Sequence, residues 1–132
     1  MDNMDSLKIA STQITPEINF DVEKKIFVIS GESRPENVKD FFEPILLWID
    51  NYFSEANKQT KHLFQIKLEY FNSSSAKYLL TILKKVGLFY QNGTEIIVQW
   101  YYETDDDDMK EAGEQMSEMS KMPFEIIEVD KL

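Results

Sequence analysis

The sequence predicts a single α/β (α+β) domain over residues 1–132, built on a mixed β-sheet of about five to six strands with helices packed on it. Two observations predict this class. In some segments apolar and polar residues alternate, as in a strand, and in others apolar residues recur every three or four positions, as in a helix. These segments follow one another in the order β-β-β-α-β-α-β-α-β, without an internal repeat or an interdomain linker, which is typical of a sheet with crossover helices.

The first three strands are expected near the start of the chain. Residues 7–14 and 17–22 alternate apolar and polar side chains, and Pro16 marks a break between them. Residues 23–25 read as a hairpin turn, so residues 26–29 form the third strand.

The first helix is expected after this strand. Ser33 is predicted as its cap, because Pro35 follows in the first turn and Glu36 lies three residues on. A wide apolar stripe then predicts an amphipathic helix that ends near Ala56. Pro44 lies inside the stripe and predicts a kink, since proline removes a donor and crowds the preceding turn.

A strand and a helix come next. Residues 63–71 form an apolar run typical of a buried strand. The segment from about Ser74 to Tyr90 repeats apolar residues at helical spacing, and Asn92-Gly93 closes it.

The last third of the chain predicts two strands around a short helix. Residues 94–102 are almost continuously β-prone, as expected for a strand covered on both faces. A helix should follow, with a methionine-rich apolar face that we interpret as core rather than binding surface: Met109, Ala112, Met116 and Met119. Pro123 ends this helix, and residues 124–129 form the last strand.

Composition and charge exclude several classes of function. The formal net charge is −10, which opposes nucleic-acid binding. The chain has no cysteine and a single histidine, His62, so we expect no disulfide, no metal site and no cofactor. No apolar run approaches a membrane span, and residues 1–6 lack the features of a secretory signal, so a cytoplasmic protein is expected.

Four consecutive aspartates, residues 105–108, suggest a calcium site at first sight. They lack the alternating spacing, the turn glycine and the terminal glutamate of an EF-hand loop. They follow Thr104 at a helix start, where carboxylates offset the helix dipole, and we favour that interpretation.

The most informative segment is Asn72-Ser73-Ser74-Ser75, where a strand meets the start of a helix. One interpretation is that Asn72 or Ser73 merely caps the helix. Another is that a serine accepts a phosphoryl group, which the unpaired amides and the dipole of a helix N-terminus favour. A serine nucleophile is disfavoured, because His62 lies at the far end of the strand and no Gly-x-Ser-x-Gly motif surrounds the serines.

Three segments resemble one protein family. These segments are Gly31-Glu-Ser-Arg-Pro-Glu36, Tyr70-Phe-Asn-Ser-Ser-Ser-Ala-Lys77, and Trp100-Tyr-Tyr-Glu-Thr-Asp-Asp-Asp-Asp-Met109 followed by Glu111-Ala-Gly113. In this order they resemble the SiaC-type regulatory phosphoproteins of bacteria, whose fold is similar to STAS domains, the anti-sigma-factor antagonists. The resemblance covers essentially the whole chain.

The resemblance implies a non-enzymatic signalling adaptor. Its partners would be a kinase with a histidine-kinase-like ATPase fold, a PP2C-type phosphatase, and a diguanylate cyclase that the unmodified form activates in cyclic-di-GMP and biofilm signalling. In the family the acceptor is typically a threonine directly after the asparagine. Ser73 occupies that place here, and Ser74 is the alternative acceptor.

The expected partner surface lies around this segment and the 30–36 loop: Asn72, Ser75, Lys77 and Arg34. Lys77 is expected to pair with the phosphate or with a partner carboxylate, or to be an ordinary solvated lysine. Two other functions stay open at this point, namely a STAS-like ligand-binding or sensor module and an anti-sigma-factor antagonist in a partner-switching system. A sensor would need a concave apolar pocket with a few convergent polar groups.

Overall fold

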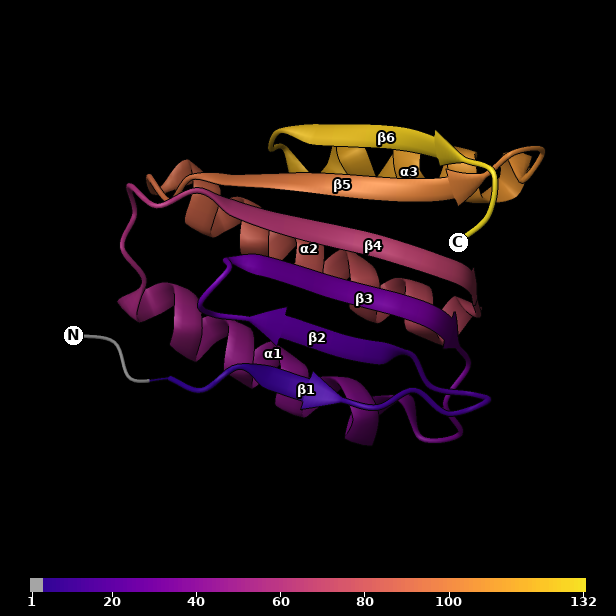
Figure 1. Cartoon of the computed structure of the whole chain (residues 1–132), viewed down its shortest axis with the longest axis horizontal. Coiled ribbons are helices and arrows are strands. Elements are labelled where there is room, and N and C mark those ends of the chain that lie inside the picture. Colours follow the sequence, from indigo (N-terminus) through magenta and orange to yellow (C-terminus); the bar gives the residue numbers. More distant parts are fainter. Residues whose placement is uncertain (1–3) are drawn as a thin grey trace.

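The structure, a computed structural model, describes residues 4–132 and has one six-stranded sheet with three helices against one of its faces (Figure 1). Residues 1–3, the start of the segment tested above for a secretory signal, lie outside the described residues. The elements are β1 (Leu7–Ile9), β2 (Glu17–Asp21), β3 (Ile26–Ser33), α1 (Val38–Glu55), β4 (His62–Phe71), α2 (Ser73–Gln91), β5 (Ile96–Glu103), α3 (Asp107–Ser120) and β6 (Phe124–Val129). The predicted fold class and element order are confirmed.

The strands lie in the sheet in the order in which they occur in the chain. β1, β2 and β3 pair antiparallel, and β3, β4, β5 and β6 pair parallel. Each parallel connection carries a helix, and all three helices lie behind the sheet in Figure 1. The carboxyl ends of β3, β4 and β5 therefore lie side by side at one end of the strands. We call this end of the sheet the carboxyl edge; it runs across the strands and is not an outer strand.

The core lies between the sheet and its helices. On β5 the buried residues alternate with half-buried ones, and Ile96, Val98 and Trp100 are fully buried. The prediction that this strand is covered on both faces was wrong. Its β-prone composition reflects one packed face and one partly exposed face, because every crossover helix covers the same side.

The predicted start of the first helix was also wrong. α1 begins at Val38, and its cap is Asn37, whose side chain accepts a hydrogen bond from the amide of Asp40 at 3.2 Å. Ser33 is instead the last residue of β3 and is fully buried. Its backbone continues the pairing with β4, opposite Phe71, which is incompatible with a helix start four residues early.

Two strand boundaries differ from those expected. The first strand covers only Leu7–Ile9, because residues 12–15 form a turn in which the Thr12 hydroxyl accepts from the amide of Thr15 at 2.9 Å. β3 continues to Ser33, well beyond residue 29. α1 is continuous through Pro44, so the proline does not end it.

The methionine face of α3 is only partly core. Met109 and Met116 are buried, as expected, but Met119 is 45% exposed and was assigned to the core wrongly. Within residues 4–132, no helix combines the length and the apolar content that crossing a bilayer requires.

Candidate functional site

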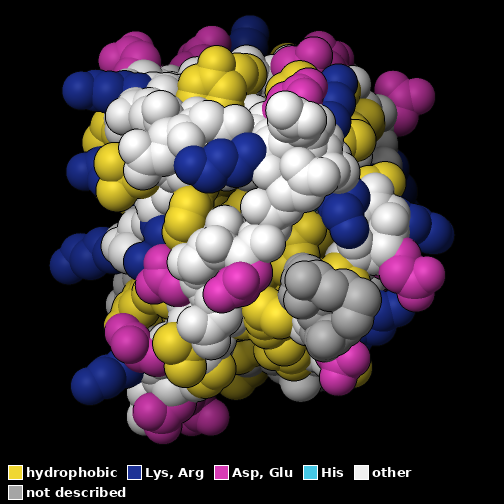
Figure 2. Space-filling model, turned by 90° about the vertical axis from the view of Figure 1, so that its left-hand side faces the viewer, with side chains coloured by type: hydrophobic (Ala, Val, Ile, Leu, Met, Phe, Trp, Pro, Cys, Tyr) yellow, Lys and Arg dark blue, Asp and Glu magenta, His cyan; other side chains and the backbone are white. Residues whose placement is uncertain are grey.

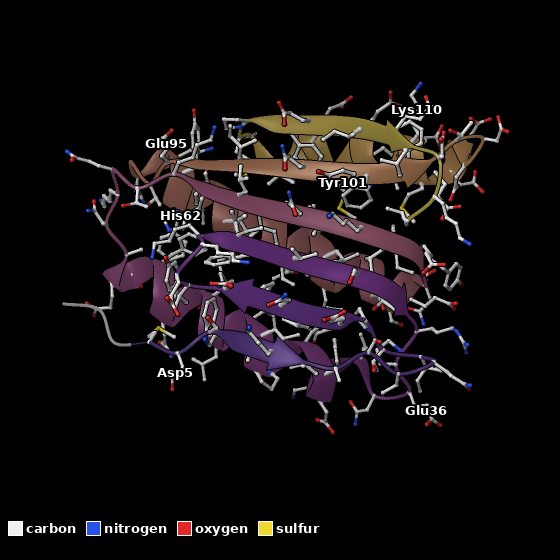
Figure 3. All side chains as sticks on the ribbon, in the orientation of Figure 1. Asp5, Glu36, His62, Glu95, Tyr101 and Lys110 are labelled. Carbon is white, nitrogen blue, oxygen red and sulfur yellow. The ribbon has the colours of Figure 1, made fainter. Side chains whose placement is uncertain are left out.

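The serine segment lies at the carboxyl edge, where β4 ends at Phe71 and α2 begins at Ser73. The connections that follow β3 and β5 reach the same edge. In Figure 3, Glu36 and Lys110 mark this end of the molecule, and His62 and Glu95 mark the opposite end. Three strand-to-helix connections are thus brought together although they are far apart in the sequence.

Asn72 caps α2. Its side-chain oxygen accepts from the amide of Ser75 at 2.9 Å, and its own carbonyl accepts from the amide of Ala76 at 2.9 Å. Asn72 therefore satisfies one of the first-turn amides that have no partner inside a helix. The capping interpretation is confirmed for Asn72, and it leaves the hydroxyls of Ser73 and Ser74 available.

Ser75 and Ser33 form a buried pair beneath the segment. The Ser33 hydroxyl donates to the Ser75 hydroxyl at 2.8 Å, and the Ser75 hydroxyl donates to the Ser33 carbonyl at 3.0 Å. The same carbonyl accepts from the amide of Asn72 at 3.0 Å. Both serines are fully buried, so Ser75 supports the junction from within rather than forming the exposed partner contact expected from the sequence.

Ser73 and Ser74 are exposed at the first two positions of α2. No described residue accepts a hydrogen bond from the backbone amide of either serine. Two unpaired amides and the positive end of a 19-residue helix dipole therefore face solvent beside two accessible hydroxyls. A helix start of this kind favours a negatively charged group.

Two cations lie near the serines. Lys77 is exposed one turn into α2, within reach of a group on Ser73 or Ser74. Arg34 follows Ser33 directly; its guanidinium donates to the Gln13 carbonyl at 3.2 Å and pairs with Glu32 at 3.4 Å. Arg34 is thus held toward the loop between β1 and β2. Lys77 forms no ion pair with a described residue, so of the two cations it is the one available to a group on the serines.

An acidic hollow of about 350 Å³ lies between this junction and the start of α3. Its wall includes Tyr70, which is 49% exposed. The other lining residues are Glu69, Phe71, Asp106, Asp108, Met109 and Ala112. Sequence reasoning missed this hollow, because its residues come from two junctions whose proximity depends on the parallel pairing of β4 with β5.

His62 is buried in the core and both of its ring nitrogens have hydrogen-bond partners. It is fully buried at the amino end of β4, where its Nδ1 lies 3.3 Å from the Glu95 carbonyl and its Nε2 lies 2.8 Å from the Tyr52 hydroxyl. The carbonyl can only accept, so Nδ1 carries the proton and Nε2 accepts from Tyr52. Burial lowers the pKa of His62, which favours this neutral form. The only histidine of the chain therefore cannot serve as a base for the serines.

The aspartate run caps α3. The Asp106 side chain accepts from the amide of Met109 at 3.1 Å, and Asp107 and Asp108 lie in the first helical turn. Among residues 4–132, no group of three or more possible metal ligands is brought together. The helix-start interpretation is confirmed.

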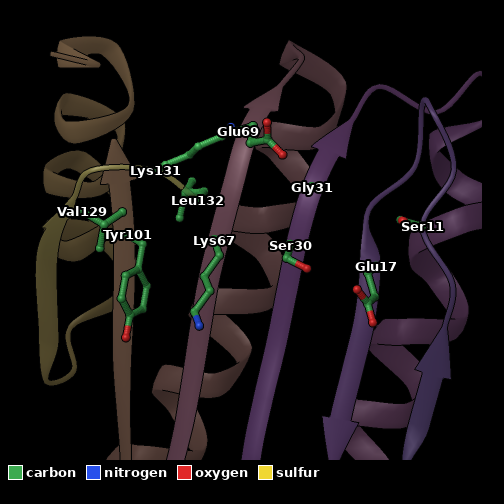
Figure 4. Close-up of a pocket in the computed structure, with 10 residues that line it drawn as sticks. All are labelled: Ser11, Glu17, Ser30, Gly31, Lys67, Glu69, Tyr101, Val129, Lys131 and Leu132. Atoms are coloured by element: carbon green, nitrogen blue, oxygen red, sulfur yellow. The ribbon is translucent and has the colours of Figure 1, made fainter. Parts of the chain in front are cut away.

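A second hollow, of about 390 Å³, lies on the face of the sheet that no helix covers (Figure 4). The Lys67 ammonium lies 4.9 Å from the centre of the Tyr101 ring on this face. Its other lining residues are Ser11, Glu17, Ser30, Gly31, Glu69, Val129, Lys131 and Leu132, so its wall combines polar and charged groups with apolar surface.

Comparison with known proteins is consistent with this geometry. The chain is similar to the crystal structure of apo-SiaC from Pseudomonas aeruginosa, with 29% identity, a TM-score of 0.84, and coverage of 94% of this chain and 99% of that one. It is also similar to a chain in the crystal structure of the diguanylate cyclase SiaD in complex with its activator SiaC from the same species, with 28% identity, a TM-score of 0.86, and coverage of 93% and 99%.

Sequence comparison leads to the same group. An uncharacterised protein of Pseudomonas aeruginosa (strain UCBPP-PA14) is 28% identical over 123 residues, which are 93% of this chain and 96% of that protein. Residues 9–129, nearly the whole chain, match the SiaC family of regulatory phosphoproteins. The family inferred from the three sequence segments is thus confirmed, and the chain belongs to the SiaC family of regulatory phosphoproteins.

Proposed function

We propose that this protein is a non-enzymatic activator of a diguanylate cyclase and that phosphorylation of Ser73 switches the activation off. The observation that carries the proposal is the exposed hydroxyl of Ser73 at the first position of α2. It lies beside two backbone amides, those of Ser73 and Ser74, from which no described residue accepts a hydrogen bond. Family membership and the similarity to SiaC, which is solved as the activator of SiaD, support the choice of partner.

Ser73 is favoured over Ser74 because it directly follows the capping asparagine, where the resemblance locates the acceptor. Both are exposed, so Ser74 is the alternative. Ser75 is unsuitable, because its hydroxyl is buried and bonded to Ser33. Exposure to a kinase thus leaves Ser73 and Ser74 as candidate acceptors, and Ser75 has a structural role.

The switch acts through charge. A phosphoryl group brings a charge of about −1.5 to −2 and three acceptor oxygens to the start of α2. The amides of Ser73 and Ser74 and the ammonium of Lys77 are positioned to interact with it. The fold is kept, and the first turn of α2 changes from neutral hydroxyls to a strongly anionic group.

Two enzymes would set the phosphorylation state. By family resemblance these are a kinase with a histidine-kinase-like ATPase fold and a PP2C-type phosphatase. Neither needs any chemistry from this chain beyond an accessible hydroxyl.

Mass spectrometry tests the acceptor. After incubation with ATP and the kinase, we expect one added phosphoryl group on the peptide that contains Ser73. Ser73→Ala should remove it, and Ser74→Ala should leave it in place. Modification of Ser74 alone would identify Ser74 as the acceptor. If a kinase of proven activity modifies neither serine, the switch is refuted.

A binding assay tests the consequence. Unmodified protein should bind the cyclase and raise cyclic-di-GMP output, and Ser73→Asp should bind about tenfold more weakly, equivalent to about 1.4 kcal/mol. Gln59→Glu, which adds one negative charge in the exposed loop before β4, is the control and should bind like the wild type. Equal affinity for Ser73→Asp and wild type would contradict the proposal.

A further inference from the structure

The charge of α2 is unlike that of the rest of the chain. The protein has a formal net charge of −10, yet residues 73–91 contain three lysines and no aspartate or glutamate. By contrast, α1 and α3 each contain several acids and one lysine. The helix that begins at the acceptor serine is therefore the basic helix of an acidic protein.

Six of the eight exposed residues of α2, all but Ser73 and Tyr90, form one continuous stripe. They are spaced alternately by three and four residues, and every one of them is exposed: Ser74, Lys77, Thr81, Lys84, Leu88 and Gln91. We call these six residues the α2 stripe. Alternating spacings of three and four place them along one side of the helix over about 25 Å, at 1.5 Å per residue.

The two lysines of the stripe are unpaired. Lys85, next to the stripe, forms an ion pair with Asp50 at 2.8 Å. Lys77 and Lys84 form no ion pair with any residue from 4 to 132, although the chain contains 24 aspartates and glutamates. They lie about 10 Å apart along the helix, one heptad from each other.

The far end of the stripe is apolar and hollowed. Leu88 is 61% exposed and Met119 of α3 is 45% exposed. Together with Lys84, Gln91, Glu118, Ser120 and Lys121 they line a groove of about 580 Å³ between the two helices. Figure 2 looks onto this end of the molecule, where both basic and acidic side chains project among apolar surface.

Gly87 allows α2 and α3 to approach closely beside the groove. A Cβ at this position would collide with the backbone carbonyl of Ser120. The helices touch here through backbone, and Leu88 and Met119, beside this contact, are exposed at the surface and line the groove.

From these observations we infer that the α2 stripe binds a helix of the partner enzyme that carries acidic residues at heptad spacing and one apolar side chain for the groove. The inference rests on the proposed function and names the surface through which it acts. The lysines supply charge complementarity, Leu88 and Met119 supply the apolar anchor, and the spacing matches helix-on-helix packing.

This surface explains how one phosphoryl group can control binding. Ser73 and Ser74 lie three or four residues before Lys77, so a phosphate on either can pair with that lysine along the helix. The dianion then neutralises the first cation of the stripe and repels the acidic face of the incoming helix. Phosphorylation therefore acts on the binding surface directly, without a conformational change.

Charge reversal on the stripe tests the inference, with the full diguanylate cyclase as the probe. Lys84→Glu and Lys77→Glu should each weaken binding of the unphosphorylated protein about tenfold, and higher salt should shrink the difference. Lys8→Glu on β1 and Lys110→Glu on α3 carry the same charge change off the stripe and should stay within about twofold of wild type.

A pair of leucines tests the apolar anchor. Leu88→Ser should weaken binding about tenfold, whereas Leu47→Ser on α1, where the leucine is 62% exposed, should not. If Lys84→Glu and Leu88→Ser bind like wild type while phosphorylation still abolishes binding, the stripe is not the surface, although the proposed function stands. If unmodified wild-type protein does not bind the cyclase, the proposed function itself fails, and the inference with it.

Discussion

The junctions β4–α2 and β5–α3 use the same local structure for different purposes. They follow neighbouring parallel strands, reach the same edge of the sheet, and start with a side-chain cap. Asn72 accepts from the amide three residues on at 2.9 Å, and Asp106 does so at 3.1 Å. They differ in charge, because α3 has Asp107 and Asp108 in its first turn and α2 has no acid there.

The difference separates a permanent charge from a conditional one. At α3 the carboxylates are built into the sequence and stabilise the helix N-terminus at all times. At α2 the same favourable position holds neutral hydroxyls, to which the proposed phosphorylation would add a removable negative charge. A helix start left without its usual acids is thus suited to a reversible modification.

The two junctions also differ in what supports them. Beneath α2 lies the hydrogen-bonded pair Ser33–Ser75. Beneath α3 lies Trp100, whose indole donates to the Met109 carbonyl at 3.0 Å and packs against Gly113. One support is polar and the other is steric, so substitutions should damage them to different extents.

The largest effect is expected from Gly113→Ala. The added Cβ would lie 2.5–2.9 Å from three atoms of the Trp100 indole, so α3 would have to move away from β5. Overpacking of this kind should lower the free energy of unfolding by about 2–3 kcal/mol, measured by denaturant titration. Gln115→Ala, exposed on the same helix, is the control. An unchanged midpoint for Gly113→Ala would show that α3 is not held sterically.

A smaller loss is expected at the other junction from Ser75→Ala. This variant removes the hydrogen bond to the Ser33 carbonyl and leaves the buried Ser33 hydroxyl without its acceptor. The free energy of unfolding should fall by about 1–2 kcal/mol in the same titration. Ser74→Ala removes an exposed hydroxyl from the same turn and should change stability little. Equal effects of the two variants would mean that the buried pair contributes nothing.

These two supports also show how far sequence reasoning reaches. Periodicity predicted the elements and their order, because each helix and strand buries one face and the pattern of that face is local. The Ser73–Ser74 segment could be located, since a polar cluster between a strand and a helix is visible in the chain. Ser33 was assigned to the wrong role, because its contact with Ser75 joins residues 42 positions apart.

Charge asymmetry was the signal that sequence reasoning overlooked. The absence of acids between residues 73 and 91 is visible without a structure, but its meaning depends on which lysines are paired. Lys85 is neutralised by Asp50 of α1, and Lys77 and Lys84 point elsewhere on the same helix. Met119 was misassigned because helical spacing alone does not show that the far end of α3 leaves its side chain 45% exposed.

The caps should show an intermediate and nearly equal effect. Asn72→Ala and Asp106→Ala each remove one side-chain acceptor from a helix start, which typically costs about 1 kcal/mol. Both variants are compared by thermal unfolding at one salt concentration. We expect the Asp106 variant to lose part of its effect in high salt, because it also removes a charge, and the Asn72 variant to be insensitive. The reverse order of salt sensitivity would contradict the distinction between the two junctions.

The smallest effect is the most informative one, because its sign differs from that of the effect on binding. Ser73→Asp adds an anion beside the free amides of α2, so it should raise the free energy of unfolding by about 0.5 kcal/mol while weakening partner binding. Asp107→Asn makes the opposite change at α3 and should lower stability by a similar amount. Both shifts should be measured in low salt and should shrink as salt is added. If Ser73→Asp instead destabilised the protein, weaker binding would follow from damage to the fold, and a switch acting on an intact surface would be untenable.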